Sequence, residues 1–259
     1  GLVREGKDQE EAKTISEAMV RNLYGAIDDA GKTKVLLFIS SKEIGSLNQL
    51  IMENWDALKS LIEVSPKPEK KSGKQTKSGL DVKCLELLKK RPVQQISPDI
   101  ALFGRMVAEG TSLNIDAACQ VAHAISTNKM TVDMDFYTAV DDLQTDDKTG
   151  AGMMGTIDFT SPCYYRYSVV DVGQLMKNLG GDQAISSISL EAFIRASIAA
   201  IPTGKQTSMA AHNPPSLVMM VVRQEGQPLS LANAFVNPVR SNDERSLIQA
   251  SIANHHQTR

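Results

Sequence analysis

A basic segment that divides the chain places the strongest limit on its fold. Residues 65–79 read SPKPEKKSGKQTKSG, with five lysines among proline, glycine and serine and no apolar periodicity. A segment of this composition cannot bury enough apolar surface to become ordered, so the sequence predicts a mobile loop here. The fold must therefore be built from a part before this loop and a part after it.

The part before the loop is predicted to be helical. Apolar residues recur at three- and four-residue spacing over residues 10–27 and again over 41–62, which indicates two amphipathic helices. Between them, residues 34–40 (KVLLFIS) fit either a short buried strand or the start of the second helix. A further short helix is expected from Asp81, and Pro92 would end it.

The part after Pro92 has a sequence pattern typical of an α/β region. The expected helix is 190–201, and residues 116–127 (DAACQVAHAIST) fit helix by composition but strand by alternation. The expected strands are 99–107 (DIALFGRMV), 135–140 (DFYTAV), 164–170 (YYRYSVV) and 216–223 (SLVMMVVR), of which the second and third form a long hairpin. This order predicts an α+β fold, an antiparallel sheet with helices on one face.

Charge is distributed unevenly along the chain. The formal net charge of −2 argues weakly against a nucleic-acid partner. Residues 66–91, however, carry nine basic residues, and residues 131–159 carry seven aspartates against one lysine. The near-neutral total therefore conceals a basic arm and an acidic arm.

Several classes of protein are not indicated. The longest apolar runs fall short of the roughly 18 residues of a membrane span, and the charged opening residues do not form a signal peptide. The three cysteines, Cys84, Cys119 and Cys163, lack zinc-site spacing, and reduced thiols in a cytoplasm are the simplest interpretation. The first residue is Gly1, which indicates a processed start or a fragment of a longer chain.

No enzyme signature can be assembled from the sequence. Gly204 and Lys205 superficially resemble a P-loop, but Ala199 stands where its first glycine belongs and the loop follows a helix instead of a strand. An ordinary loop is the commoner interpretation, with a phosphate contact as the alternative. His123 lies in an alternating apolar run and is expected to be a hydrogen-bonded core residue. The paired Asp141 and Asp142 match no calcium loop, so no metal site is predicted.

Met153 and Met154 follow the acidic, glycine-rich stretch and are expected at the tip of the hairpin. Methionine there can fill a gap in a core or subunit contact. It can also act as an apolar wedge between nucleic-acid bases. The residues alone leave both possibilities open.

Five stretches together resemble the CasC family, the backbone subunit of the type I-E CRISPR surveillance complex, Cascade. They are SPDIALFGRMVAEG, DAACQVAHAISTNKMTVDMDFYTAVDDLQ, GTIDFTSPCYYRYSVVDVGQLMKNLGG, IPTGKQTSMAAHNPPSLVMMVVR and PLSLANAF. The resemblance is close from Ser97 to Phe235 and looser before Pro92. Nothing here matches the family's first strand and basic, serine-rich segment, or its C-terminal end, so the chain is expected to be a partial version.

The resemblance implies an RRM-like (ferredoxin-like) palm with a helical fingers insertion and a β-hairpin thumb. The fingers would be residues 1–92, with the basic loop at 65–79, and the palm would be residues 93–259. The thumb would be the hairpin at about 128–163. Residues 116–127 become strand by this resemblance.

The resemblance also implies a non-catalytic protein, without cofactor or metal, that polymerises along CRISPR RNA in the cytoplasm and presents it to target DNA. Its partners would be other copies of itself and the large, small, cap and RNA-processing subunits of Cascade, with no membrane. The RNA contacts it implies are Arg105, Met106, Thr138, Met153, Met154, Gly204, Lys205 and Gln206. The DNA contacts would be Lys67, Lys70, Lys71, Lys74 and Lys77.

Two other functions fit an RRM-like fold. One is an RNA-processing endoribonuclease, which would need a general acid and base beside the RNA, and His123 has no visible partner in the sequence. The other is a generic RNA-recognition domain, which the absence of an aromatic-rich RNP motif argues against.

Overall fold

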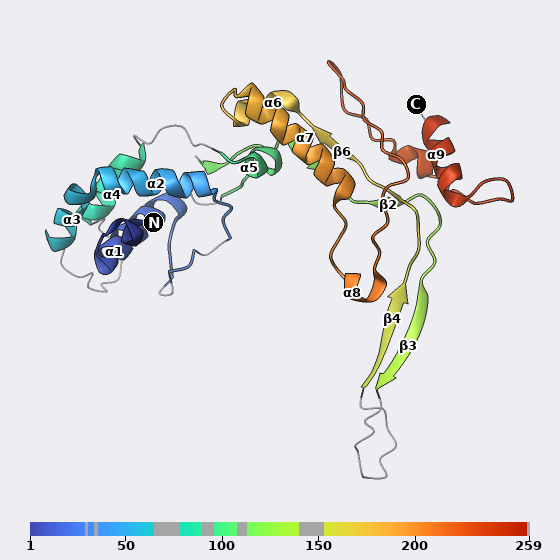
Figure 1. Ribbon diagram of the computed structural model, residues 1–259, viewed down its shortest axis with the longest axis horizontal. Coiled ribbons are helices and arrows are strands. Elements are labelled where there is room, and N and C mark those ends of the chain that lie inside the picture. The colour runs from blue at the N-terminus through green and yellow to red at the C-terminus, as the bar shows by residue number, and fades with distance from the viewer. Residues whose placement is uncertain are drawn as a thin grey trace, which may run out of the picture. The chain divides into compact units, whose positions relative to one another are not determined.

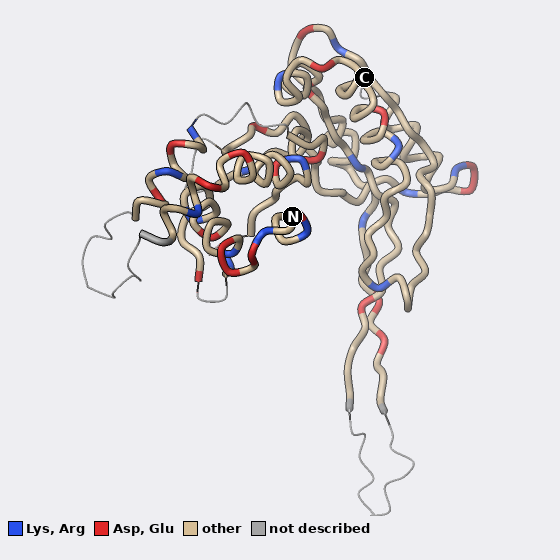
Figure 2. The backbone as a smooth tube through the Cα atoms, turned by 60° about the vertical axis from the view of Figure 1, so that its left-hand side comes forward, with Lys and Arg blue, Asp and Glu red and all other residues tan. Residues whose placement is uncertain are grey.

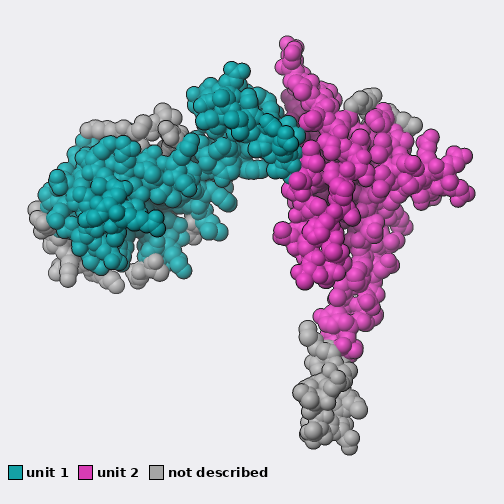
Figure 3. Space-filling model, in the orientation of Figure 1, with its two compact units in different colours: residues 1–120, 170–196 teal, residues 121–169, 197–259 magenta. Residues whose placement is uncertain are grey.

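The chain divides into two compact units, which Figure 3 shows in different colours. The structure is a computed structural model, and it describes residues 1–28, 31–33, 36–64, 78–89, 96–107, 113–139 and 153–257. Unit 1 comprises residues 1–120 and 170–196, and unit 2 comprises residues 121–169 and 197–259. The two units do not coincide with the expected domains 1–92 and 93–259, whose boundary stays a prediction.

The first half of unit 1 is the predicted helical region (Figure 1). It contains the 3-10 helix η1 (Leu2–Glu5) and the helices α1 (Gln9–Tyr24), α2 (Ser41–Glu53), α3 (Trp55–Val64) and α4 (Gly79–Lys89). Their apolar faces meet in one core, with Ile15, Leu58 and Cys84 fully buried. Burial raises the pKa of the Cys84 thiol to about 11, so this cysteine is a packing residue.

The predicted single helix over 41–62 is divided in two at Asn54. The Asn54 side chain donates to the Leu50 carbonyl oxygen at 2.9 Å, and its backbone ends α2 in a non-helical conformation. Asparagine competes for backbone hydrogen bonds in this way, which is why it favours helix ends. Residues 36–40, between α1 and α2, form neither the strand nor the helix expected of them, and Phe38 is exposed.

The second half of unit 1 packs three helices around a short strand. These elements are α5 (Pro98–Phe103), β1 (Cys119–Val121), α6 (Val172–Asn178) and α7 (Gln183–Ala199). Ala101, Cys119 and Leu175 form their shared core, against which the half-buried Leu190 and Phe193 of α7 pack. Helix α7 begins earlier than the predicted 190–201.

The predicted strand over 99–107 is wrong at its start, where the chain is helical. Pro98 occupies the first turn of α5, where its missing N–H costs nothing, and Asp99 accepts a hydrogen bond from the Ser97 hydroxyl. These polar residues initiate a helix whose apolar residues are then buried, so a buried apolar run did not distinguish helix from strand.

Unit 2 holds the hairpin and a small C-terminal assembly. Strand β2 (Ile125–Ser126) pairs with β5 (Tyr164–Tyr165), and β3 (Asp133–Ala139) pairs antiparallel with β4 (Met153–Phe159). The remaining elements are β6 (Ser168–Val170), which pairs with β1, and α8 (Gln206–Met209), η3 (Ala232–Phe235) and α9 (Leu247–Gln257). A hairpin thus lies within residues 128–163, but its second strand is β4. The predicted pairing of residues 135–140 with 164–170 is wrong, because β5 pairs with β2 and β6 pairs with β1. Strand segments within 116–127 are confirmed.

The C-terminal helix of unit 2 is anchored on Tyr165. Its ring packs against Phe235 and His255, with centroids 5.5 and 6.0 Å away, and its hydroxyl accepts the Leu231 N–H at 3.0 Å. His255 is buried, although a histidine near the end of the sequence carried no signal of a packing role. His123, in contrast, is exposed between β1 and β2, so its expected place in a core is wrong.

The single antiparallel sheet expected for residues 93–259 is not formed by the described residues. They contain three separate two-stranded ladders instead. Residues 216–223 belong to no strand, and the side chains of Leu217, Met220 and Val222 are exposed where burial was predicted. A β-strand requires a neighbouring strand to pair with, and an apolar run in the sequence does not show whether one is present.

Candidate functional site

The hairpin β3–β4 presents large apolar side chains on one of its two faces. It extends away from the rest of unit 2 in Figures 1 and 2. Residues directly opposite one another in an antiparallel pair lie on the same face, and successive residues alternate between faces. From the register, one face carries Met134, Phe136, Thr138, Met154, Thr156 and Asp158. We call this set the methionine face.

The apolar residues of the methionine face are unusually exposed. Met134 is 67% exposed, Phe136 is 72% exposed and Met154 is 75% exposed. Thr138 lies directly opposite Met154, and Thr156 lies opposite Phe136, so small side chains separate the large ones. Three large apolar side chains on one face of a projecting hairpin are the kind of surface that proteins keep for a partner.

The opposite face of the hairpin has a different character. Asp133 and Asp135 are exposed on it, and the Tyr137 side chain lies across the ladder over Gly155. A Cβ atom at Gly155 would lie 2.4 Å from the Tyr137 hydroxyl oxygen, so the glycine makes room for the ring. Both aspartates therefore point away from the methionine face, although acidic residues mark both strands of the hairpin (Figure 2).

The two methionines that the sequence singled out lie in a strand. Met153 and Met154 begin β4, opposite Ala139 and Thr138, instead of standing at a loop tip. The expected exposure of Met154 is confirmed, while the side chain of Met153 lies outside the described part. The sequence reasoning missed Met134 and Phe136. The two-residue spacing of Met134, Phe136 and Thr138 could have indicated that they share one face of a strand.

Another exposed methionine, Met106, lies in unit 1, directly after Gly104 and Arg105. Gly104 ends α5 with φ 76° and ψ 175°, a conformation that favours glycine. A Cβ atom there would lie 2.8 Å from the Ile115 carbonyl oxygen and 3.0 Å from the Ala117 nitrogen. Glycine at this position therefore permits the close approach of two chain segments, and it sets the direction of the residues that follow.

Replacing Gly104 with alanine is expected to destabilise the chain by about 2 kcal/mol, because the backbone conformation and the approach to Ile115 both exclude a Cβ atom. Urea unfolding of the purified chain measures this change. Gly45→Ala is the matched control. Gly45 lies within α2 with open space around it, so alanine there should stabilise by about 0.5–1 kcal/mol. Equal effects of the two substitutions would contradict the steric role of Gly104.

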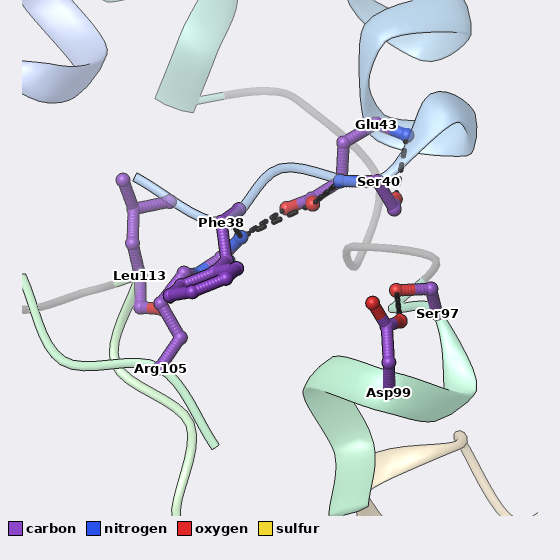
Figure 4. Close-up of polar contacts among 7 residues, drawn as sticks. All are labelled: Phe38, Ser40, Glu43, Ser97, Asp99, Arg105 and Leu113. Atoms are coloured by element: carbon purple, nitrogen blue, oxygen red, sulfur yellow. Dashed lines mark hydrogen bonds and ion pairs between the residues drawn. The ribbon is translucent and has the colours of Figure 1, made fainter. Parts of the chain in front are cut away.

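Arg105 is buried in an ion pair. Its Nη1 atom lies 2.9 Å from Glu43 Oε1, and the two side chains are only 2% and 1% exposed. The same nitrogen donates to the Phe38 carbonyl oxygen at 3.1 Å, and Nε donates to the Leu113 carbonyl oxygen at 3.0 Å. Figure 4 shows the Arg105 side chain directed at Glu43, close to Ser40 at the start of α2.

These contacts correct the expected phosphate contact by Arg105. Its guanidinium group is committed to a carboxylate and two carbonyl oxygens inside unit 1, so it offers no exposed charge to RNA. Met106, the next residue, is 88% exposed, while Val107 after it is buried. The chain thus turns Met106 outward between two inward-pointing neighbours.

The third predicted contact region is the loop before α8. Lys205 is exposed and adopts a left-handed conformation with φ 58°. The Gln206 side chain points back and donates to the Pro202 carbonyl oxygen at 2.8 Å, which closes the loop. Gly204 has open space around it and a φ outside the left-handed region, so the fold itself does not require glycine there.

The predicted contacts fall in both units. Met106 belongs to unit 1, while the methionine face and Lys205 belong to unit 2. The predicted DNA contacts Lys67, Lys70, Lys71, Lys74 and Lys77 lie outside the described residues, as do Asp141 and Asp142. Within the described ranges, no group of three histidine, cysteine or acidic residues could hold a metal ion, and no helix is long and apolar enough to cross a membrane.

Comparisons with known proteins agree with one another. The family model described as "CT1975-like protein" matches residues 1–258. A solved chain titled "CRISPR RNA-guided surveillance complex, pre-nicking" is similar with a TM-score of 0.76 and 28% identity over 99% of this chain and 68% of that chain. Another, titled "CRISPR RNA-guided surveillance complex", has a TM-score of 0.55 and 35% identity over 62% and 60% of the two chains. No curated protein matches significantly.

Proposed function

The chain belongs to the CT1975-like protein family, and from that premise we propose that it is a guide-RNA-binding backbone subunit of a CRISPR RNA-guided surveillance complex of type I-E. The observation that carries the proposal is the methionine face, which is exposed on a projecting hairpin. Solved chains titled as surveillance complexes share the mixed α+β fold. Copies of the chain would polymerise along the RNA in the cytoplasm and present it for pairing with target DNA.

The methionine face suits a base contact that is independent of sequence. A base turned out of the stack exposes apolar surface that needs a new contact. Methionine supplies soft, adaptable apolar area and has no hydrogen-bonding pattern that would select one base. A protein that holds any guide needs this property, because base pairing reads the target. In this proposal Met154 and Thr138 act from the methionine face, Met153 acts from the same end of β4, and Met106 acts from unit 1.

The division into palm, fingers and thumb is part of the proposal. The β3–β4 hairpin is the thumb, and the helical region before residue 92 is the fingers. An RRM-like palm is supported by residues 216–223, whose exposed apolar side chains need a neighbouring strand to cover them. The five lysines of the basic loop attract target DNA through their charge. The other partners would be further copies and the large, small, cap and RNA-processing subunits.

An RNA-processing endoribonuclease is the alternative function. It requires a general acid and base held beside the scissile phosphate. His123 is exposed, so it is free of the core role first expected of it, and a His123→Ala variant tests this alternative directly. We propose a non-catalytic subunit, and RNA cleavage that is lost in His123→Ala would support the alternative instead.

Native mass spectrometry of the purified chain, expressed together with a guide RNA and the other complex subunits, tests the proposed function. Several copies bound to one RNA, which separate after nuclease treatment, would support it. The bases turned outward should react with a chemical probe at regular intervals along the guide. Recovery of the chain without RNA under these conditions would contradict the proposal.

Changing Lys205 to glutamate should weaken RNA binding equally for unrelated guides, because phosphates carry no sequence information. The dependence of binding on salt should also flatten by about one released counterion. Affinity measured by fluorescence anisotropy at several salt concentrations gives both quantities. Arg240→Glu, an exposed charge reversal in the same unit, is the matched control. If the salt dependence of RNA binding is unchanged in Lys205→Glu, the loop has a structural role and no phosphate contact.

A further inference from the structure

Met106 owes its position to the residues on either side of it. The Arg105 N–H donates to the Ile115 carbonyl oxygen at 3.0 Å, and the Ile115 N–H donates back at 2.9 Å. The Val107 N–H donates to the Asn114 side-chain oxygen at 2.6 Å, and the Val107 side chain is buried against Tyr24 and Leu113. The backbone around Met106 is therefore fixed although its own side chain is free.

The Arg105 side chain also restricts the backbone next to Met106. It reaches three acceptors on two separate stretches of chain: the Phe38 carbonyl oxygen and the Glu43 carboxylate on one, and the Leu113 carbonyl oxygen on the other. These hydrogen bonds are directional, so they define both where Arg105 lies and how it is turned. A rotation of the backbone at Arg105 would move Met106 and break these contacts together.

Glu43 is itself held at the start of α2. Its carboxylate accepts the Ser40 N–H at 2.9 Å, while the Ser40 hydroxyl accepts the Glu43 N–H at 3.1 Å, which is a capping box. The positive end of the helix dipole also favours a carboxylate at this position. Glu43 therefore has little freedom to follow Arg105, and the orientation of α2 is transmitted to the segment that carries Met106.

A buried ion pair contributes little to the net free energy of folding. The loss of water around both charges offsets most of their attraction, and apolar residues of similar volume often stabilise as well or better. An ion pair does impose one geometry, which an apolar contact does not. We propose that Glu43 and Arg105 are positioning residues that hold Met106 in place for its contact with the guide RNA, an assignment that rests on the proposed function.

The double variant Glu43→Leu with Arg105→Met separates positioning from stability. It replaces both charges with apolar groups of similar volume, so the chain should stay folded. Affinity for a single-stranded RNA of guide length should fall about tenfold, comparable to the effect of Met106→Gly, because both lose one base contact. Adding Met106→Gly to the double variant should cause no further loss. Amide hydrogen exchange at Arg105 and Val107 should become faster.

A matched control is the ion pair of Lys59 with Glu11, which joins α3 to α1 at 2.9 Å. Its apolar replacement should leave RNA affinity unchanged. If Glu43→Leu with Arg105→Met does not fold, Arg105→Lys is the second variant. Lysine keeps the charge but cannot reach all three acceptors, so the same changes are expected at a smaller size.

The outcomes distinguish this assignment from the proposed function. Wild-type affinity in the folded double variant would overturn the assignment. The assignment would also be overturned if the double substitution lowered RNA affinity as much in a Met106→Gly chain as in the wild type. The Glu43–Arg105 pair would then affect RNA binding independently of Met106. Unchanged amide exchange with normal RNA binding would also overturn the assignment alone. A wild-type chain that binds no RNA within the assembled complex would overturn the proposed function and the assignment together.

Discussion

Replacing Arg105 with alanine should lower the free energy of unfolding by about 3–5 kcal/mol. The change leaves the Glu43 carboxylate buried without its cation, and it removes the donor to the Phe38 and Leu113 carbonyl oxygens. An unpaired buried charge and unsatisfied buried acceptors are among the most destabilising defects in a protein. Urea unfolding, with the midpoint and the slope fitted separately, measures the loss.

Arg195→Ala is the matched control for this experiment. Arg195 also forms an ion pair with a glutamate, Glu191, at 2.8 Å, but the two side chains are 78% and 64% exposed. Water already solvates both charges, so the control should change stability by no more than about 0.5 kcal/mol. The loss at Arg105 should also persist at high salt, because buried charges are screened little. Equal effects at the two arginines would show that burial does not govern the strength of the Glu43–Arg105 pair.

Replacing Met134, Phe136 and Met154 together with threonine should weaken RNA binding at least 100-fold. Each contact between a side chain and an unstacked base is worth roughly 1–3 kcal/mol, and the variant removes three large side chains from one face. Threonine keeps the β-propensity of the hairpin. Since all three side chains are exposed, the melting temperature of the free chain should hardly change. Anisotropy with a guide-length RNA and thermal unfolding give the two quantities.

The matched control for the methionine face lies on the same hairpin. Asp133→Asn with Asp135→Asn changes the opposite face, so RNA affinity should stay the same or rise slightly as negative charge is removed. The reactivity of the outward-turned bases adds a further test. If the triple threonine variant weakens assembly but leaves the reactivity pattern intact, the methionine face contacts protein and the wedge is wrong. A large fall in the free chain's melting temperature would place these side chains in its own core.

The helical region was predictable because its signals are local. A three- and four-residue spacing of apolar residues defines α1, and the strand-like run at 135–140 marked the first strand of the hairpin. The second strand was predicted at 164–170 and lies at Met153–Phe159. The buried apolar run at Pro98–Phe103 was predicted as a strand and is a helix. Such a run fits either element, and the residues before it decide. Here Ser97, Pro98 and Asp99 are typical of a helix start. Residues 216–223 misled for a different reason: an apolar run forms a buried strand only where another chain segment lies beside it, and these side chains are exposed.

The candidate site divides in the same way. The exposure of Met154 followed from its polar, glycine-rich surroundings. The partner of Arg105 did not follow. Glu43 lies 62 residues earlier in the chain, and a buried arginine and an exposed one have the same sequence signature. The burial of His255 against Tyr165 was equally invisible.

The sequence by itself determined the elements whose cause is local: the amphipathic helices, and the alternation along β3 that puts Met134 and Phe136 on one face. The pairing of β3 with β4, which adds Met154 to that face, came from the structure. Side-chain direction along a strand has a period of two, so the face follows once the register is known. Only the tertiary structure decided which charges are buried, because the burial of Arg105 depends on α2, on Phe38 and on the Leu113 segment meeting around it. Contacts between distant segments have no local pattern, and so the sequence did not show that Arg105 is paired with Glu43 inside unit 1.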